Sequence, residues 1–149
     1  MARLILHGIA ILVIGCVTTP LLLAKEKPLS PIDAAANVPD GKETLIEAKI
    51  GTSGIFKSKS GHYVFLTDAE KYGETEYLIV VIPAESFKKF GDADPYKLRS
   101  RFTDKKIHVR GVVQKEIMKV RSDKGAFVVE WVRVRIEVTD PKQIEILKE

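Results

Sequence analysis

Hydrophobic and polar residues alternate along both ends of the stretch from residue 105 to residue 138. Apolar positions recur at every second residue from Ile107 to Val113, and again from Val132 to Val138. A period of two gives a strand one apolar and one polar face, as a half-buried strand requires. Between the two arms, residues 122–125 (Ser-Asp-Lys-Gly) have turn chemistry. The pattern predicts a long β-hairpin.

Three more strands are predicted before this hairpin. Alternation over 44–50 predicts a first strand that continues, through a bend marked by glycines, into residues 55–56. Aromatic and β-branched residues predict a second strand over 62–67. Residues 77–82 are apolar at every position except Tyr77 at its start, which predicts a central strand covered on both faces.

Two short helices and a closing strand complete the predicted elements. Residues 84–90 predict a helical turn ended by Gly91, and Asp94-Pro95 offers an N-cap and a first-turn proline for a helix to about Phe102. Residues 143–147 predict a short closing strand. The fold class is therefore all-β with one or two short helices. A helix between strands three and four and a long bent first strand predict a five-stranded Greek-key barrel of OB type, with a long hairpin joining strands four and five.

Three segments carry a resemblance to a known family. Residues 57–66, 107–113 and 136–144 resemble bacterial OB-fold domains of the nucleic-acid-binding, tRNA/helicase kind. Together they extend over residues 45–147, and their order and spacing carry the resemblance. It implies a nucleic-acid-binding surface. The hairpin between strands four and five looks longer than the compact connection of that family, so the ligand-binding surface departs from the family more than the barrel does.

The first 24 residues have a different composition from the rest. Arg3 precedes an apolar stretch over 4–17 that only His7 and Gly8 interrupt, and Pro20 follows. This pattern predicts a secretory signal, with an uncleaved N-terminal anchor as the alternative. Residues 25–42 contain three prolines and no apolar period, which predicts a flexible tether before a single domain over 43–149. We expect an exported protein, periplasmic or lipid-anchored to a membrane.

Cys16 is the single cysteine of the chain. Its setting, Val13-Ile14-Gly15-Cys16, resembles the bacterial lipobox, in which the cysteine is lipidated and becomes the first residue. Against lipidation, residues 17–24 stay largely apolar, so Cys16 is alternatively a small residue of a cleaved signal. Lipidation would attach the domain to a membrane surface.

Positive charge is concentrated in the predicted hairpin. Residues 105–135 contain nine Lys and Arg against three Asp and Glu, or +6, whereas the whole chain carries +4. Such a local excess is typical of surfaces that bind a phosphate backbone. The candidate contacts to nucleic acid or another polyanion are Lys57, Lys59, Tyr63, Arg110, Lys119, Arg121, Trp131, Arg133 and Arg135.

Trp131 and the two lysines each allow a second interpretation. Trp131, Arg133 and Arg135 share one strand face, so the tryptophan could stack on a base. The apolar phase slips near Trp131, however, which favours packing beneath another segment. Lys57 and Lys59 are either a solvated turn or the flank of the binding face.

No enzyme signature is present. His62 and His108 lie far apart in sequence and in no metal-ligand spacing, and the chain has neither a phosphate-binding glycine loop nor a nucleophile elbow. Asp92 and Asp94 fit a helix cap better than a cation site. We therefore expect no catalytic activity, no cofactor and no metal.

Two classes of function remain. The first is weak binding of nucleic acid or another polyanion through the basic hairpin. The second is a periplasmic, stress-associated interaction module with a protein or small-molecule partner, in which the hairpin docks through Ile117, Met118, Val120, Phe127 and Val129. An oligosaccharide ligand is a third alternative, for which one tryptophan offers little stacking surface.

Overall fold

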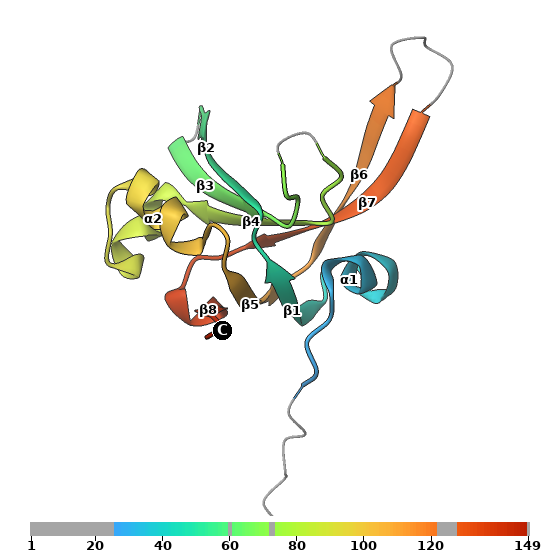
Figure 1. The fold of residues 1–149 in the computed structure, drawn as a ribbon, viewed down its shortest axis with the longest axis horizontal. Helices are drawn as coiled ribbons and strands as arrows, with labels where there is room; N and C mark the ends of the chain where they lie inside the picture. Colours follow the sequence, from blue (N-terminus) through green and yellow to red (C-terminus); the bar gives the residue numbers. More distant parts are fainter. Residues whose placement is uncertain (1–25, 60, 72–73, 122–127, 149) are drawn as a thin grey trace, which may run out of the picture.

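The computed structural model describes residues 26–59, 61–71, 74–121 and 128–148, and the fold of this part is mostly β (Figure 1). Its strands form two sheets. The smaller sheet has the order β1-β5-β8, with strands β1 (Glu43–Lys49), β5 (Lys106–Val112) and β8 (Ile144–Ile146). The larger sheet has the order β2-β3-β4-β7-β6, with strands β2 (Thr52–Ser58), β3 (Gly61–Thr67), β4 (Leu78–Pro83), β7 (Val128–Glu137) and β6 (Gln114–Arg121).

Two of the predicted strands are each divided by a bend. The first bend separates β1 from β2 at residues 50–51, where a Cβ on Gly51 would lie 2.4 Å from the carbonyl oxygen of Ala69. Only glycine fits so close an approach, and the predicted bend is confirmed. The second bend, at Val113, separates β5 from β6 and was not predicted. The described residues therefore form eight strands in two sheets, where the sequence predicts five in one barrel.

The strand pairings of the described residues all lie within one sheet or the other. β1 pairs with β5, β2 with β3 and β3 with β4, all antiparallel. β4 pairs with β7 in parallel, and β7 pairs with β6 in the predicted antiparallel hairpin. β1 leads into β2 through the bend at residues 50–51, and β5 leads into β6 through the bend at Val113, so the chain itself joins the two sheets.

The two predicted helices are present between β4 and β5. The 3₁₀ helix η1 (Ala84–Phe90) ends at Gly91 in the left-handed region, with φ 78°. In α2 (Pro95–Phe102), the Asp94 carboxylate accepts the backbone N–H of Tyr96 at 2.9 Å. The rings of Phe90 and Phe102 meet edge to face, with centroids 6.5 Å apart, and both are buried. The helices thus cover one end of the core. A third short 3₁₀ helix, η2 (Pro141–Gln143), precedes β8.

The segment 25–42 differs from the flexible tether that the sequence predicts. It contains the helix α1 (Pro31–Asn37), whose N-cap Ser30 accepts the backbone N–H of Asp33 at 3.1 Å. Ala34, Ala35 and Val38 are buried in the core. Before the helix, Leu29 forms a bridge with β1, donating to Leu45 and accepting from Glu47. The packed domain therefore begins near residue 29.

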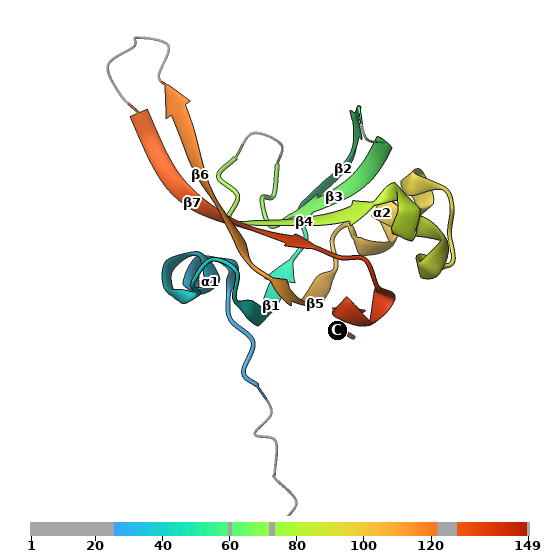
Figure 2. The ribbon, with the colours of Figure 1, turned by 180° about the vertical axis from the view of Figure 1, so that it is seen from behind.

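The core lies between the inner faces of the two sheets, with α1 at one side and α2 at the other (Figures 1 and 2). Its fully buried side chains come from alternate strand positions, among them Ile46, Leu66, Val80, Ile107 and Ile136. No helix in the described part of the chain is long and apolar enough to cross a membrane. The predicted signal, Cys16 and the turn at 122–125 lie outside the described residues.

Candidate functional site

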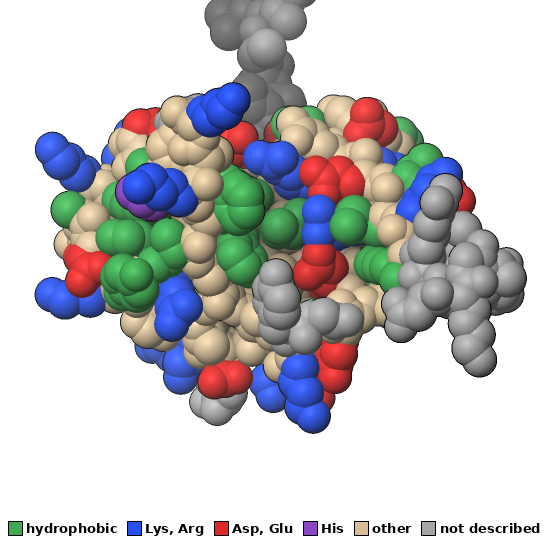
Figure 3. Space-filling view, turned by 90° about the horizontal axis from the view of Figure 1, so that it is seen from above, with side chains coloured by type: hydrophobic (Ala, Val, Ile, Leu, Met, Phe, Trp, Pro, Cys, Tyr) green, Lys and Arg blue, Asp and Glu red, His purple; other side chains and the backbone are tan. Residues whose placement is uncertain are grey.

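The larger sheet is curved, and the hairpins β2–β3 and β6–β7 both rise on its hollow side (Figures 1 and 2). We call this side the concave face. Strand register assigns alternate side chains to it. In the view onto this face, apolar side chains gather over the middle, with charged side chains among them (Figure 3). The side chains on the concave face include Phe56, Tyr63, Phe65, Val81, Arg135, Arg133, Glu116, Met118, Val120 and Trp131.

Aromatic rings form one end of the concave face. Phe56 and Tyr63 are cross-strand partners whose rings stack at 5.1 Å between centroids and 28° between planes. Phe56 remains 52% exposed. Next to them, Phe65 lies over Gly54, where a Cβ would come within 2.4 Å of its ring. Lys57 and Lys59 are exposed near the tip of this hairpin, and Lys57, the cross-strand partner of His62, alternates with Phe56 and so points to the other side of the sheet.

An ion network occupies the centre of the face. Arg133 forms ion pairs with Glu76 and with Glu116, and its Nε donates to Glu116 at 3.0 Å. Its side chain is only 15% exposed. Arg135 lies 3.7 Å from the same Glu116, and its Nε is buried with no partner in the described part of the chain. The sequence predicts both arginines as free cations on an exposed strand, whereas here their charges are compensated by carboxylates.

Trp131 forms the opposite end. Its indole N–H donates to the carbonyl of Glu76 at 2.8 Å, so the ring is half-buried against the segment that leads into β4. This geometry agrees with the interpretation that Trp131 packs against another segment of the chain. The ring also lines a groove of about 270 Å³ together with Phe65, Met118 and Lys71. Thr67 lines the same groove and is 2% exposed, and its hydroxyl has no hydrogen-bond partner among the described residues.

Asp68 anchors the connection between β3 and β4 beside this groove. Its Oδ1 accepts the backbone N–H groups of Tyr77 and Leu78, each at 2.9 Å. Burial raises the pKa of the Asp68 carboxyl, and these two hydrogen bonds act in the opposite direction. The carboxylate thus fixes the start of β4 directly after Glu76, the residue that contacts both Trp131 and Arg133.

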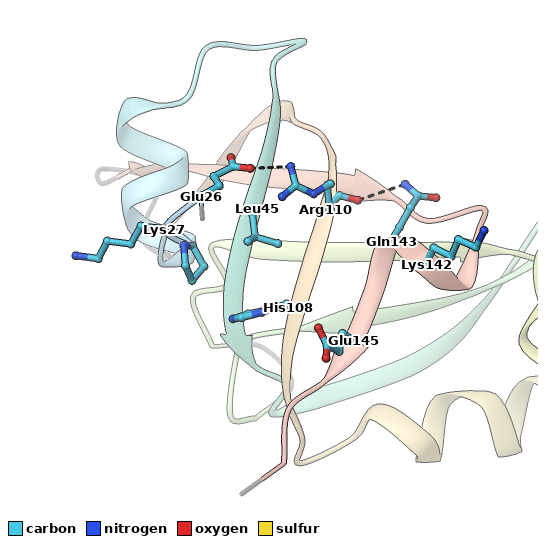
Figure 4. Close-up of a pocket in the computed structure, with 9 residues that line it drawn as sticks. Glu26, Lys27, Leu45, His108, Arg110, Lys142, Gln143 and Glu145 are labelled. Atoms are coloured by element: carbon cyan, nitrogen blue, oxygen red, sulfur yellow. Dashed lines mark hydrogen bonds and ion pairs between the residues drawn. The ribbon is translucent and has the colours of Figure 1, made fainter. Parts of the chain in front are cut away.

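Arg110 lies elsewhere, on the smaller sheet. It borders an open groove of about 590 Å³ between residues 26–28, β1, β5 and residues 142–145 (Figure 4). Its Nη1 is 2.7 Å from the Glu26 carboxylate. On the same sheet, the Lys106 ammonium and, to a smaller extent, His108 lower the pKa of Glu47. Charges of both signs line this groove, so it is not a cationic surface.

The structure therefore brings only part of the predicted set together. Tyr63 lies at one end of the concave face and Trp131 at the other, and Lys57 and Lys59 lie near the tip of the β2–β3 hairpin, with Lys57 on its opposite side. Lys119 and Arg121 lie on β6, where Lys119 is 3.5 Å from Glu130. Asp92 accepts the backbone N–H of Asp94, and no group of residues in the described ranges could hold a metal ion.

Sequence reasoning missed Phe56, Phe65 and Lys71, and it considered Met118 only for docking of a protein partner. Phe56 and Phe65 occupy alternate positions on paired strands, and a strand model with correct register would have placed both beside Tyr63. Lys71 belongs to a loop and Met118 to β6, and their place in the groove depends on how the sheet curves. Alternation alone carries no signal for that curvature.

Comparisons with known proteins add a distant likeness. No family model matches the chain, and no curated protein matches it. Among solved structures, it is similar to a protein assigned as an aspartyl-tRNA synthetase from Leishmania major Friedlin, at 13% identity and a TM-score of 0.47 over 89% of this chain and 23% of that one. It is also similar to the aspartyl-tRNA synthetase of Entamoeba histolytica, at 15% identity and a TM-score of 0.45 over 98% and 28%.

A third similar structure is an OBody bound to hen egg-white lysozyme, at 14% identity and a TM-score of 0.40 over 77% of this chain and 91% of that one. This chain thus spans about a quarter of each synthetase. Likeness at this level identifies neither a family nor a ligand.

Proposed function

We propose that this chain is an exported, non-enzymatic binding module of OB type, and that its concave face binds single-stranded nucleic acid. The order of strand pairings supports the OB type. The bent segment 43–58, which contains β1 and β2, pairs through β1 with β5 and through β2 with β3. β4 lies parallel to β7. The helix α2 lies between β4 and β5, as in a Greek-key barrel of this type.

The observation that carries the ligand proposal is the stacked pair Phe56–Tyr63. Both rings belong to the concave face, and more than half of Phe56 is open to solvent although it is a large apolar side chain. A base can stack on such a ring whatever its sequence, and each stacked base contributes about 1–3 kcal/mol. Trp131, across the face, offers a second ring edge at the groove.

Phosphate contacts come from the rim rather than from the centre. Arg133 and Arg135 are compensated by Glu76 and Glu116, so they add little net attraction for an anion. Of the exposed cations nearby, Lys71 lines the groove and Lys59 lies at the turn of the β2–β3 hairpin, whereas Lys57 points to the other side of that hairpin. Two contacts to a single strand correspond to a slope of about −1.4 in log K against log salt. Binding is therefore carried mainly by stacking.

The test uses Trp131, the single tryptophan of the chain, as the reporter. Its fluorescence is followed while oligo(dT) is added at two salt concentrations. Phe56→Ala should weaken binding about tenfold, because it removes one stacking surface. Tyr96→Ala is the matched control, because Tyr96 is 66% exposed on α2, away from the concave face. Equal losses in the two variants, or no binding of the parent protein at low salt, would contradict the proposal.

A further inference from the structure

The edge strand β6 presents a second surface, which borders the concave face along one side. β6 is the last strand of the larger sheet, and only β7 pairs with it in that sheet. Residues 40–42 cover the beginning of its other edge. Val113 exchanges backbone hydrogen bonds with Gly41 and Lys42, and the N–H of Lys115 donates to the Asp40 carboxylate at 2.7 Å. Backbone groups of odd-numbered residues therefore point away from β7.

Beyond Lys115 this edge is uncovered by the described residues. Antiparallel pairing directs the N–H and C=O of alternate residues to the same side, so those of Ile117, Lys119 and Arg121 point outward. The side chains of Ile117 and Val120 are 62% and 52% exposed, and the hairpin extends beyond the rest of the domain (Figure 1). Such an edge is a template on which another strand can pair.

The charges of β6 select the partner. Self-pairing about a two-fold axis would place like charges opposite each other: centred on Ile117, Lys115 would face Lys119 of the copy, and centred on Met118 it would face Arg121. Like charges directly opposite destabilise a strand pair. Lys115 has no ion pair within the described ranges, and Lys119, although it lies 3.5 Å from Glu130, is 61% exposed. An acidic strand is therefore favoured over a second copy.

We infer that the β6 edge binds an extended segment of another protein that alternates acidic and apolar side chains. Its backbone would pair with residues 117–121. Its acidic residues would lie opposite Lys119 and diagonally across from Lys115, and its apolar residues would lie opposite Met118 and Val120, on the other face of the new strand. This inference does not depend on nucleic-acid binding at the concave face.

The test is a titration of the ¹⁵N-labelled full chain with a peptide of alternating Glu and Val, followed by amide hydrogen exchange. We expect the amides of Ile117, Lys119 and Arg121 to become protected, while those of Glu116 and Met118, which already face β7, change little. Ile117→Pro removes one outward N–H without touching the β6–β7 ladder and should abolish this protection. Lys57→Glu is the control, because it alters the charge of the other hairpin and should leave binding of the peptide unchanged.

Charge reversal keeps the test decisive if the proline variant does not fold. Lys115→Glu with Lys119→Glu should weaken binding of the Glu-Val peptide about tenfold and favour a Lys-Val peptide instead. Absence of protection by the Glu-Val peptide overturns the inference. So does protection of the same amides by oligo(dT) alone, which would assign these lysines to nucleic acid. Concentration-dependent protection without any peptide would assign the edge to a second copy.

Discussion

At the scale of single residues, Asp68 makes the stability of the fold depend on pH. Because burial raises its pKa, the folded state binds the proton more readily than the unfolded chain. The free energy of unfolding therefore falls as pH rises from the ordinary aspartate value, near 3.9, through the folded pKa. Asp68→Asn removes this titration and keeps an oxygen acceptor for Tyr77 and Leu78.

We expect Asp68→Asn to gain stability relative to the parent protein as pH rises through that window, measured by urea denaturation at several pH values. Asp68→Ala leaves both backbone N–H groups without their acceptor and should lose about 1–3 kcal/mol. Parallel pH profiles for the parent and the Asn variant would show that Asp68 does not titrate in this way.

Arg133 is a second residue whose role the structure changes. Arg133→Met removes the cation shared by Glu76 and Glu116 and should cost about 1–3 kcal/mol, between the values for exposed and for buried pairs. Adding Glu116→Gln should restore part of this loss, and a double-mutant cycle measures the coupling. Lys57→Met, at an exposed position, is the control. No difference between the two single variants would mean that the network adds nothing to stability.

At the scale of elements, α1 is part of the domain. Leu29, Ala34, Ala35 and Val38 pack against the core, so a chain that begins at residue 40 loses their burial. We expect it to be less stable by roughly 2–5 kcal/mol than a chain that begins at residue 26, which keeps α1. Thermal denaturation of the two chains compares them. Equal melting temperatures would mean that α1 is dispensable, as the sequence-based tether implies.

The strands could be predicted because each buries one face, and alternation records that burial directly. The predicted strands at 44–50, 62–67 and 77–82 agree with β1, β3 and β4 to within one residue at either end. α1 escaped prediction because only Ala34, Ala35 and Val38 face the core, too few for a helical stripe. Its start signals, Ser30-Pro31 with Asp33 following, were nevertheless present.

The candidate site was predictable only to the level of strand faces. Alternation places Trp131, Arg133 and Arg135 together, and the structure agrees. It cannot show that Glu76, far away in sequence, neutralises Arg133 or accepts from Trp131, since those contacts depend on the path of a loop. A count of charges along the hairpin therefore overstated the positive field of the surface.

At the scale of the whole molecule, we predict that the first 24 residues direct export of the domain. We expect export to remove at least residues 1–15. Intact mass and N-terminal sequencing of the mature protein would show a lipidated start at Cys16 or an unmodified start beyond it. With a lipid, Cys16→Ser should move the protein from the membrane to the soluble fraction. A mature protein that retains Met1 would instead support the uncleaved anchor.

The pairing of β4 with β7 has a consequence for how the chain folds. The β2–β3 and β6–β7 hairpins join neighbours in sequence and can form within microseconds. Leu78 meets Val134, and Glu43 meets Val112, only after long intervening segments have been ordered. Such non-local contacts place folding in the range of milliseconds to seconds. During that interval the edges of β4 and β7 that later pair with each other are exposed. The newly synthesised chain is therefore prone to aggregate until this pairing forms.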